Sequence, residues 1–215
     1  MTLASSALTT VATVLDELDL EGADRKVRAR IERYITSASS LVAVILGNGR
    51  TRQLHEAAVT VAVAGMGHPI LILPHTPIVS VAEVLIDDEA VDADEYEIHN
   101  AEAGFLFRVD GTWPASMLIR GGTVGARAPG TERKNIEVTY TAGWKTPAQA
   151  GTQTLPTAIE DAVVELVVSR WRRRGKDLRV VGETLAGGSS YTYGGAAVPP
   201  EVMAALGPYV RIANG

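Results

Sequence analysis

The residues best suited to chemistry form a basic cluster around one tryptophan in the last third of the chain. The cluster consists of Arg170, Trp171, Arg172, Arg173, Arg174, Lys176 and Arg179. Such cations can bind phosphate groups, because each neutralised phosphate releases a counterion and adds affinity. Cations in the last turn of a helix also stabilise that helix by about 0.3 to 1 kcal/mol each, and a tryptophan with arginine stems beside it can be a packing anchor. We favour the structural or protein-docking interpretation over DNA binding, because the whole chain has a formal net charge of −5.

Other residue patterns give no indication of an active site. The glycine-rich segment GGTVGARAPG lacks the Gly-Lys-Ser/Thr sequence of a phosphate loop, and no predicted helix follows it. No serine lies in a Gly-x-Ser-x-Gly turn, and the chain contains no cysteine that could act as a nucleophile or a thiolate ligand. The sequence therefore predicts no catalytic residue, no cofactor and a protein that is not an enzyme.

The histidines and the densest acidic run do not match metal-binding patterns. The four histidines, at positions 55, 68, 75 and 99, lie on different predicted elements without metalloprotease spacing, so we expect them at the surface or at sheet edges. The acidic run consists of Asp87, Asp88, Glu89, Asp92, Asp94 and Glu95. It lacks the alternating ligands and central glycine of a calcium loop, so we expect a solvated turn and no metal site.

Length and composition indicate one domain, or a small domain with an appendage. The chain has 215 residues, of which 46% are hydrophobic, and a chain of this size typically buries roughly 70% of its unfolded surface. The N-terminal segment has no basic region and acquires acids at Asp16, Glu17 and Asp19, so we expect no cleaved signal peptide. The chain also lacks an apolar run of about 18 residues, so we expect no membrane partner.

Hydrophobic periodicity predicts helices at both ends of the chain. A long helix is expected from Gly22 to Gly47, with apolar residues at steps of three and four on one face. This predicted stripe comprises Val27, Ile31, Tyr34, Ala38, Leu41 and Ile45. The other expected helices are a short one over residues 8–18 with Val11, Leu15 and Leu18 inward, one that begins with a Thr157-x-x-Glu160 capping box and ends at Gly175, and a terminal one after Pro199 and Pro200.

The middle of the chain has the period of β-strands. In IEVTYTAGW, Ile136, Val138 and Tyr140 fall on one side of a strand that ends at Gly143. The other expected strands cover residues 54–63, 70–73 and 78–87, and residues 96–109 are expected to form a hairpin closed by Asp110-Gly111.

Two segments are expected to lie outside regular structure. Residues Gly121 to Asn135 contain too much glycine, proline and charge for a regular element, so we expect a long mobile loop that binds or docks something. From about Val180, a glycine-rich tail has too little apolar surface to fold alone. We expect this tail to become ordered against a partner or against the body of the protein.

The order of these segments resembles the head–tail connector (adaptor) family of tailed double-stranded DNA bacteriophages. The matching segments, which span residues 23–174, are the helix end ITSASSLVAVILGNGR, the strand pair LILPHTPIVSVAEVLIDDEAV, the hairpin YEIHNAEAGFLFRVDGTWP, the strand IEVTYTAGW and the helix LPTAIEDAVVELVVSRWRRR. GGSSYTYGG and the terminal helix also match longer family members. No single motif is highly specific, but the ordered set is.

The resemblance implies an α+β fold and a structural role in a virion. It implies a helical bundle of N-terminal and C-terminal helices that carries a β-rich insertion, with an extended C-terminal tail. The implied parts are N-terminal helices over residues 1–50, a β-rich insertion over 51–145, a C-terminal bundle helix over 146–179, and a docking tail with a short helix over 180–215. It implies a ring of about twelve copies in the neck between capsid and tail, made in the host bacterial cytoplasm. The implied partners are the portal protein and a stopper or tail terminator, and DNA would pass through the channel without specific binding.

Two sets of residues are expected to act in that role. Docking to the portal or another partner is expected at Arg170, Trp171, Arg172, Arg173, Arg174, Tyr191, Tyr193, Leu206 and Tyr209. A structural junction is expected at Gly143, which permits the sharp exit from the sheet, and at Trp144, which would bury a large apolar area at the seam. The alternative function is a DNA-binding module that uses the patch from Arg170 to Arg179, and a third is a small hydrolase.

Overall fold

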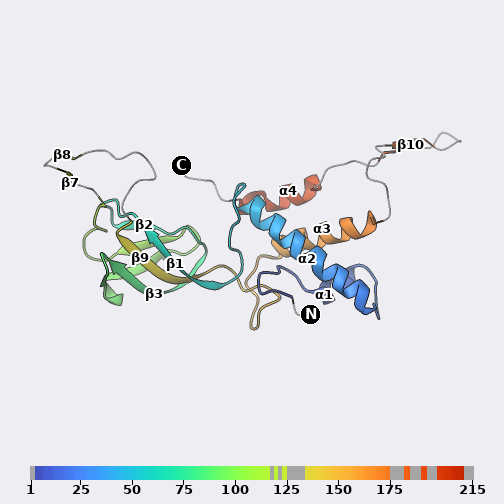
Figure 1. Cartoon of the computed structure of the whole chain (residues 1–215), viewed down its shortest axis with the longest axis horizontal. Coiled ribbons are helices and arrows are strands. Elements are labelled where there is room, and N and C mark those ends of the chain that lie inside the picture. Colours follow the sequence, from blue (N-terminus) through green and yellow to red (C-terminus); the bar gives the residue numbers. More distant parts are fainter. Residues whose placement is uncertain are drawn as a thin grey trace. The chain divides into compact units, whose positions relative to one another are not determined.

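The chain has a mixed α+β architecture, with helices from both ends and antiparallel sheets from the middle (Figure 1). A computed structural model describes residues 3–116, 119–120, 123–124, 134–174, 182–184, 190–192 and 198–210. These residues fall into two compact units. The helical unit consists of Met1–Arg52 and Lys145–Gly215, and the sheet unit consists of Gln53–Trp144. The predicted α+β class is confirmed.

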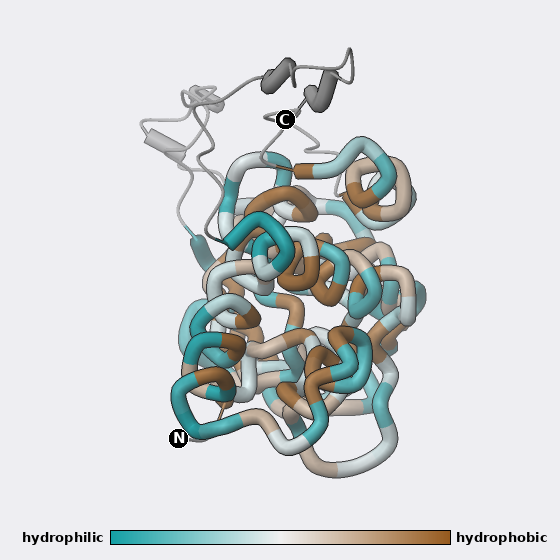
Figure 2. The backbone as a smooth tube through the Cα atoms, turned by 90° about the vertical axis from the view of Figure 1, so that its right-hand side faces the viewer, coloured by the Kyte–Doolittle hydropathy of each residue, from teal (hydrophilic) through white to brown (hydrophobic). Residues whose placement is uncertain are grey.

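The described residues of the helical unit form four α-helices. They are α1 (Val11–Glu17), α2 (Arg25–Leu46), α3 (Thr157–Arg172) and α4 (Pro200–Leu206), with a 3-10 turn η2 (Gly207–Tyr209). Helices α1, α2 and α3 contact one another, and α4 contacts α3. Apolar and polar stretches alternate along these helices, as Figure 2 shows, so each helix has an apolar side to bury against its neighbours.

The buried face of α2 differs from the predicted stripe. The buried residues are Ile31, Ile35, Ala38, Ser39, Val42 and Leu46. Leu41, which was expected inward, is 38% exposed. The buried face also includes a polar residue, Ser39, which apolar periodicity does not predict. Ser39 can be buried because its hydroxyl oxygen accepts a hydrogen bond from the Leu8 N–H at 3.1 Å. In α1 the buried residues are likewise Val14 and Leu15 rather than the predicted set.

Polar side chains cap the start of α1 and of α2. The side chain of Thr10 accepts from the Thr13 N–H at the start of α1, and Asp24 Oδ1 accepts from the Val27 N–H at 2.7 Å at the start of α2. The capping box predicted for α3 does not form, because Pro156 is the N-cap residue and makes no side-chain cap. The Glu160 carboxylate instead accepts from the Thr9 hydroxyl and from Gln153 Nε2.

The sheet unit contains two principal antiparallel sheets. The larger has the order β1 (Ala57–Val63), β9 (Ile136–Ala142), β3 (Ile78–Ile86) and β4 (Glu89–Ala90). The smaller has the order β2 (Ile70–Ile72), β6 (Phe105–Arg108) and β5 (Tyr96–Asn100), preceded by a 3-10 turn η1 (Ala93–Glu95). The predicted hairpin is present as β5–β6. The predicted pairing of the segments now seen as β2 and β3 is wrong, because β2 pairs with β6, where Leu71 lies opposite Leu106 in the core.

Two aromatic side chains fill the core of the sheet unit. Trp113 is 0% exposed, and its indole N–H donates to the Leu106 carbonyl. Tyr140 on β9 is also 0% exposed, and its hydroxyl accepts from the His75 N–H at 3.0 Å. Ile136 and Val138 are buried on the same side of β9, as the alternation predicts.

Short strands interrupt the two segments expected to be irregular. β7 (Ile119–Arg120) pairs with β8 (Thr123–Val124), so the prediction of no regular element from residue 121 is wrong at β8. Residues 125–133 of that segment lie outside the described part of the chain. In the tail, β10 (Gly182–Thr184) pairs with β11 (Ser190–Thr192), and the expectation for residues 185–189 and 193–197 concerns positions that the structure does not describe.

Candidate docking surfaces

Arg170 lies on the surface of α3 and contacts α2. Its guanidinium carbon lies 4.5 Å from the ring centroid of Tyr34, and Nη1 donates to the Ser37 hydroxyl at 3.1 Å. A cation over an exposed aromatic face contributes about 0.5 to 1 kcal/mol. Arg170 therefore links two helices of the unit, and it is still exposed enough to meet a partner.

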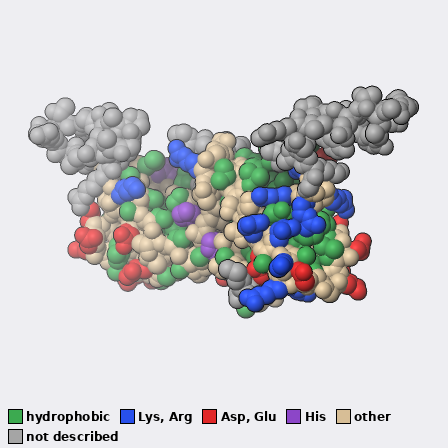
Figure 3. Space-filling model, turned by 45° about the vertical axis from the view of Figure 1, so that its right-hand side comes forward, with side chains coloured by type: hydrophobic (Ala, Val, Ile, Leu, Met, Phe, Trp, Pro, Cys, Tyr) green, Lys and Arg blue, Asp and Glu red, His purple; other side chains and the backbone are tan. Residues whose placement is uncertain are grey.

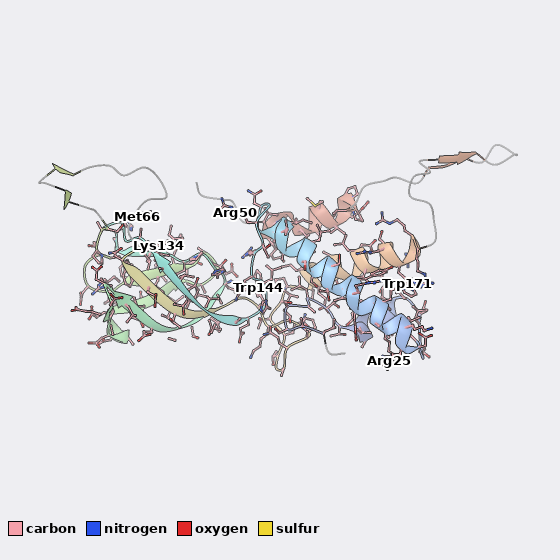
Figure 4. All side chains as sticks on the ribbon, in the orientation of Figure 1. Arg25, Arg50, Met66, Lys134, Trp144 and Trp171 are labelled. Carbon is pink, nitrogen blue, oxygen red and sulfur yellow. The ribbon has the colours of Figure 1, made fainter. Side chains whose placement is uncertain are left out.

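The next arginines of the cluster differ in their local contacts. Arg173 donates from Nε to the Ser169 carbonyl and from Nη2 to the Ser169 hydroxyl, so its side chain closes the last turn of α3. Trp171, labelled on α3 in Figure 4, is half-buried, and the guanidinium carbon of Arg174 lies 4.1 Å from its ring centroid. Arg172 and Arg174 are exposed. The surface offered here is thus a pair of exposed cations beside a partly covered indole. The last two cations of the predicted cluster, Lys176 and Arg179, lie outside the described residues.

A second set of cations, not identified from the sequence, lies on α2. Lys26, Arg30 and Arg33 are exposed and follow one another at steps of four and three, so they share one side of the helix. The next residue at this spacing is Ser37, which holds Arg170. We call Lys26, Arg30, Arg33 and Arg170 the basic stripe, and Figure 3 shows Lys and Arg side chains gathered over the helices. The spacing of these cations is visible in the sequence, but the same helix also carries apolar residues at helical spacing, and these predict only its buried face.

The two units carry opposite charge. The helical unit contains 15 Lys and Arg residues and 12 Asp and Glu residues, whereas the sheet unit contains 5 and 13. The net charge of −5 is therefore the sum of a basic unit and a strongly acidic unit. A uniform acidic protein would repel further copies of itself, but a protein divided in this way can attract them.

Gly143 and Trp144 form the end of the sheet unit. Gly143 has φ +107°, and a Cβ at this position would lie 2.4 Å from the His55 carbonyl oxygen. The Trp144 N–H donates to the Leu54 carbonyl at 2.8 Å, and its own carbonyl accepts from the Glu56 N–H at 2.8 Å. The Trp144 side chain is half-buried, so the tryptophan that fills the core is Trp113 and not Trp144.

The residues expected to dock near the C-terminus are placed differently. Leu206 is 0% exposed within the helical unit, so its side chain lies in the core, and its contact with a partner stays a prediction. Tyr209 is half-buried, and its carbonyl accepts from Arg52 Nη1 at 3.0 Å. This hydrogen bond joins the end of η2 to Arg52, the last residue of the N-terminal part of the helical unit. The backbone of Tyr191 lies in β11, and Tyr193 lies outside the described residues.

Several other residues with possible chemistry lie apart from one another. The four histidines are half-buried or exposed, and the ring of His99 lies 5.9 Å from that of Phe107. In the acidic run, Glu95 pairs with Arg108, and the other five acids are exposed. Among the described residues, no three His, Asp or Glu side chains come together as a metal-ion site would require. Within the same residues, no helix combines the length and apolar character needed to cross a membrane.

The two units present charged and apolar surfaces, which is typical of a protein that binds other proteins in an assembly. The family model described as head completion protein matches residues 7–212. The chain therefore belongs to the head completion protein family, which confirms the resemblance to phage head–tail connectors. No curated protein matches the sequence significantly.

Solved structures share the fold. A chain from the neck of an empty gene transfer agent (GTA) particle, computed with C6 symmetry, is 19% identical with a TM-score of 0.58, and the match covers 100% of this chain and 96% of that one. A chain from the virion of a native GTA particle is 17% identical with a TM-score of 0.55 and the same coverage. At these identities the likeness establishes the fold.

Proposed function

We propose that the chain is a structural protein of the virion neck, a head–tail adaptor that joins the DNA-filled capsid to the tail. The observation that carries this proposal is the family match over residues 7–212, which includes both units and the terminal helix α4. The neck and virion origin of the two solved neighbours supports it. The contacting helices of the helical unit provide a bundle on which the sheet unit is inserted, and the role is mechanical rather than enzymatic.

The adaptor forms a ring below the portal. A closed ring needs a heterologous contact, in which one surface of a copy meets a different surface of the next. The neck that contains one structural neighbour was computed with C6 symmetry. A ring of about twelve copies is compatible with this symmetry, because twelve is a multiple of six. The acidic balance of the chain suits a channel that passes DNA, because a lining that met about six to ten phosphates would hold the DNA instead.

Contact with the portal is assigned to the exposed end of α3. Arg172 and Arg174 beside Trp171 offer cations and an apolar ring, and contact with the next component is assigned to the tail around Tyr191 and Tyr193. Assembly is then sequential, because the next component binds only after the previous ring is in place. The next component in this order is a stopper or tail terminator.

Mixing the full-length chain with purified portal rings tests the proposal. We expect co-migration of a ring-on-ring complex in native electrophoresis and two stacked rings in electron micrographs. Arg172→Glu with Arg174→Glu should reduce complex formation at least about tenfold, whereas Arg50→Glu, an exposed cation elsewhere on the helical unit, should leave it unchanged. A failure to bind across salt and pH conditions would contradict the proposal.

The basic stripe supports a second candidate, a DNA-binding module. Four cations aligned on two contacting helices could follow a phosphate backbone. A gel shift with duplex DNA at increasing salt separates the two functions. Tight binding that weakens steeply with salt would favour the module, and no binding at physiological salt would favour the adaptor.

A further inference from the structure

The smaller sheet turns an apolar face away from the core of its unit. Leu71 and Leu106 point inward and are 4% and 0% exposed. Because side chains alternate along a strand, their neighbours point to the opposite face. The pairs Ile70–Phe107 and Ile72–Phe105 lie opposite each other across β2 and β6, which brings the four side chains together. We call Ile70, Ile72, Phe105 and Phe107 the outer sheet face.

This face contains both phenylalanines of the chain. Neither belongs to the core cluster, which is built around Trp113 and Tyr140, and Ile72 is 51% exposed. Large aromatic side chains are normally among the most buried, so their placement on a non-core face indicates a surface that is covered in an assembly. Aromatic residues are also enriched at the centres of protein interfaces.

Acidic residues lie on β5, the strand next to β6, and just before it. Glu97 lies on β5 directly opposite Phe107, and the exposed carboxylates of Asp92 and Asp94 precede the same strand. The unit as a whole has eight more acids than bases. The outer sheet face is therefore an apolar centre with a negative rim, and a partner must offer an apolar contact among positive charges.

The helical unit of the same chain offers that combination. The basic stripe runs along α2 to Ser37 and Arg170, and Leu41 lies one turn further at the same spacing. Leu41 is 38% exposed, although it lies in a helix whose other face is buried. The stripe and Leu41 thus form a positive surface with an apolar end.

We infer that the outer sheet face of one copy docks on the basic stripe and Leu41 of a second copy, and this inference rests on the proposed ring. The contact is heterologous, so it can repeat from copy to copy and close. Opposite charge fixes the partner and the orientation, while the apolar centres supply buried area. Duplex DNA would satisfy the cations but would leave Leu41 and the two phenylalanines without a counterpart.

Charge exchange in the full-length chain tests this contact. Arg30→Glu with Arg33→Glu reverses the stripe, and Asp94→Lys with Glu97→Lys reverses the rim. In sedimentation velocity at low salt, each pair of substitutions should weaken self-association at least about tenfold. The chain with all four substitutions should regain association to within about threefold of the unmodified chain, because the charges are again opposite. Added salt should weaken the association of the unmodified and the fully exchanged chain alike.

Matched substitutions test the apolar centre. Ile72→Ser should weaken self-association, whereas Met66→Ser should not, because Met66 is 86% exposed but lies outside the outer sheet face. Circular dichroism spectra that remain unchanged for both variants show that the fold is retained. Equal effects of the two substitutions would contradict the inference.

Four outcomes would overturn the inference. The first is no self-association of the unmodified chain at low salt, and the second is self-association that does not change with salt. The third is failure of the four combined substitutions to restore self-association. The fourth is an effect of the charge substitutions that is independent of protein concentration, which would place the contact within one copy.

Loss of duplex DNA binding on stripe reversal, with unchanged self-association, would assign the stripe to DNA. If the chain is found in particle necks while these variants assemble normally, only this inference fails. If the exchange restores association but the chain is absent from necks, the proposed function fails.

Discussion

At the scale of single residues, position 143 requires glycine for two reasons, its backbone conformation and the lack of space for a side chain. A side chain there would be strained at φ +107° and would collide with the backbone of His55. Gly143→Ala should therefore lower the free energy of unfolding of the sheet unit by at least about 2 kcal/mol, measured by denaturant titration of the full chain.

Gly111→Ala is the matched control for this change. Gly111 also has positive φ, at +93°, but a Cβ there would meet nothing within 4 Å. It should cost only the conformational strain, about 1 kcal/mol. Equal losses for the two variants would show that crowding by His55 does not matter.

Asn135 is a structural residue at the end of a segment predicted to be a loose loop. It is 8% exposed, its Oδ1 accepts from the Gly65 N–H, and its Nδ2 donates to the Pro114 carbonyl. Asn135→Ala would leave these backbone groups without their partners and should destabilise the fold by about 2 to 4 kcal/mol in a thermal or denaturant melt. Lys134→Ala, at the exposed neighbouring position, should change stability by less than about 0.5 kcal/mol.

Ionisation of the Tyr96 phenol should lower the free energy of unfolding at high pH. Burial, and then the charge of Glu83, raises the pKa of the Tyr96 phenol above 10.0. The pKa of Tyr96 is therefore higher in the folded protein than in the unfolded chain. Its contribution to the free energy of unfolding is fully present below pH 10.0 and is lost as the pH rises through the pKa of the folded state. Across this alkaline range, the unfolding free energy of Tyr96→Phe should fall less steeply than that of the unmodified chain. Parallel slopes would contradict the assignment.

At the scale of elements, the start of α2 depends on one carboxylate. Asp24 Oδ1 accepts from the Val27 N–H, and the basic stripe begins in the same turn, at Lys26. Asp24→Ala should cost about 0.5 to 2 kcal/mol and reduce helicity, whereas Asp24→Asn should retain most of the stability because its amide oxygen can accept the same bond. Amide hydrogen exchange at residues 25–30 would report the fraying directly.

Local patterns were sufficient to predict elements whose partners are close in sequence. The β5–β6 hairpin and the alternation of β9 follow from period and turn residues. The pairing of β2 with β6 joins residues more than 30 positions apart, and only burial of Leu71 against the core selects it. The face of α2 was missed for a related reason, because Ser39 is buried through a hydrogen bond that no hydrophobic scale records.

The candidate surfaces were predictable only in part. The run of arginines around Trp171 is visible as sequence, but Arg173 closes its own helix and Arg170 binds α2, which are matters of tertiary structure. Leu206 was expected at a docking surface, and its burial depends on how α4 packs. The outer sheet face could not be foreseen, because the two phenylalanines read as core residues until the register of β6 is known.

At the scale of the whole molecule, the division of charge between the two units is the property most relevant to assembly. An acidic sheet unit and a basic helical unit in one chain favour ordered contact between copies, and such attraction is weakened by salt. We therefore expect purified chain to associate more strongly at about 20 mM salt than at about 500 mM, measured by light scattering across protein concentrations. Association that strengthens with salt would instead indicate a purely apolar contact.

The most direct test of the proposed role is electron microscopy of particles that carry a small label on this chain. The account predicts label in a ring at the joint between capsid and tail, and particles made without the chain should accumulate as filled heads that lack tails. Label distributed over the capsid or along the tail, or tailed particles assembled in its absence, would contradict the account.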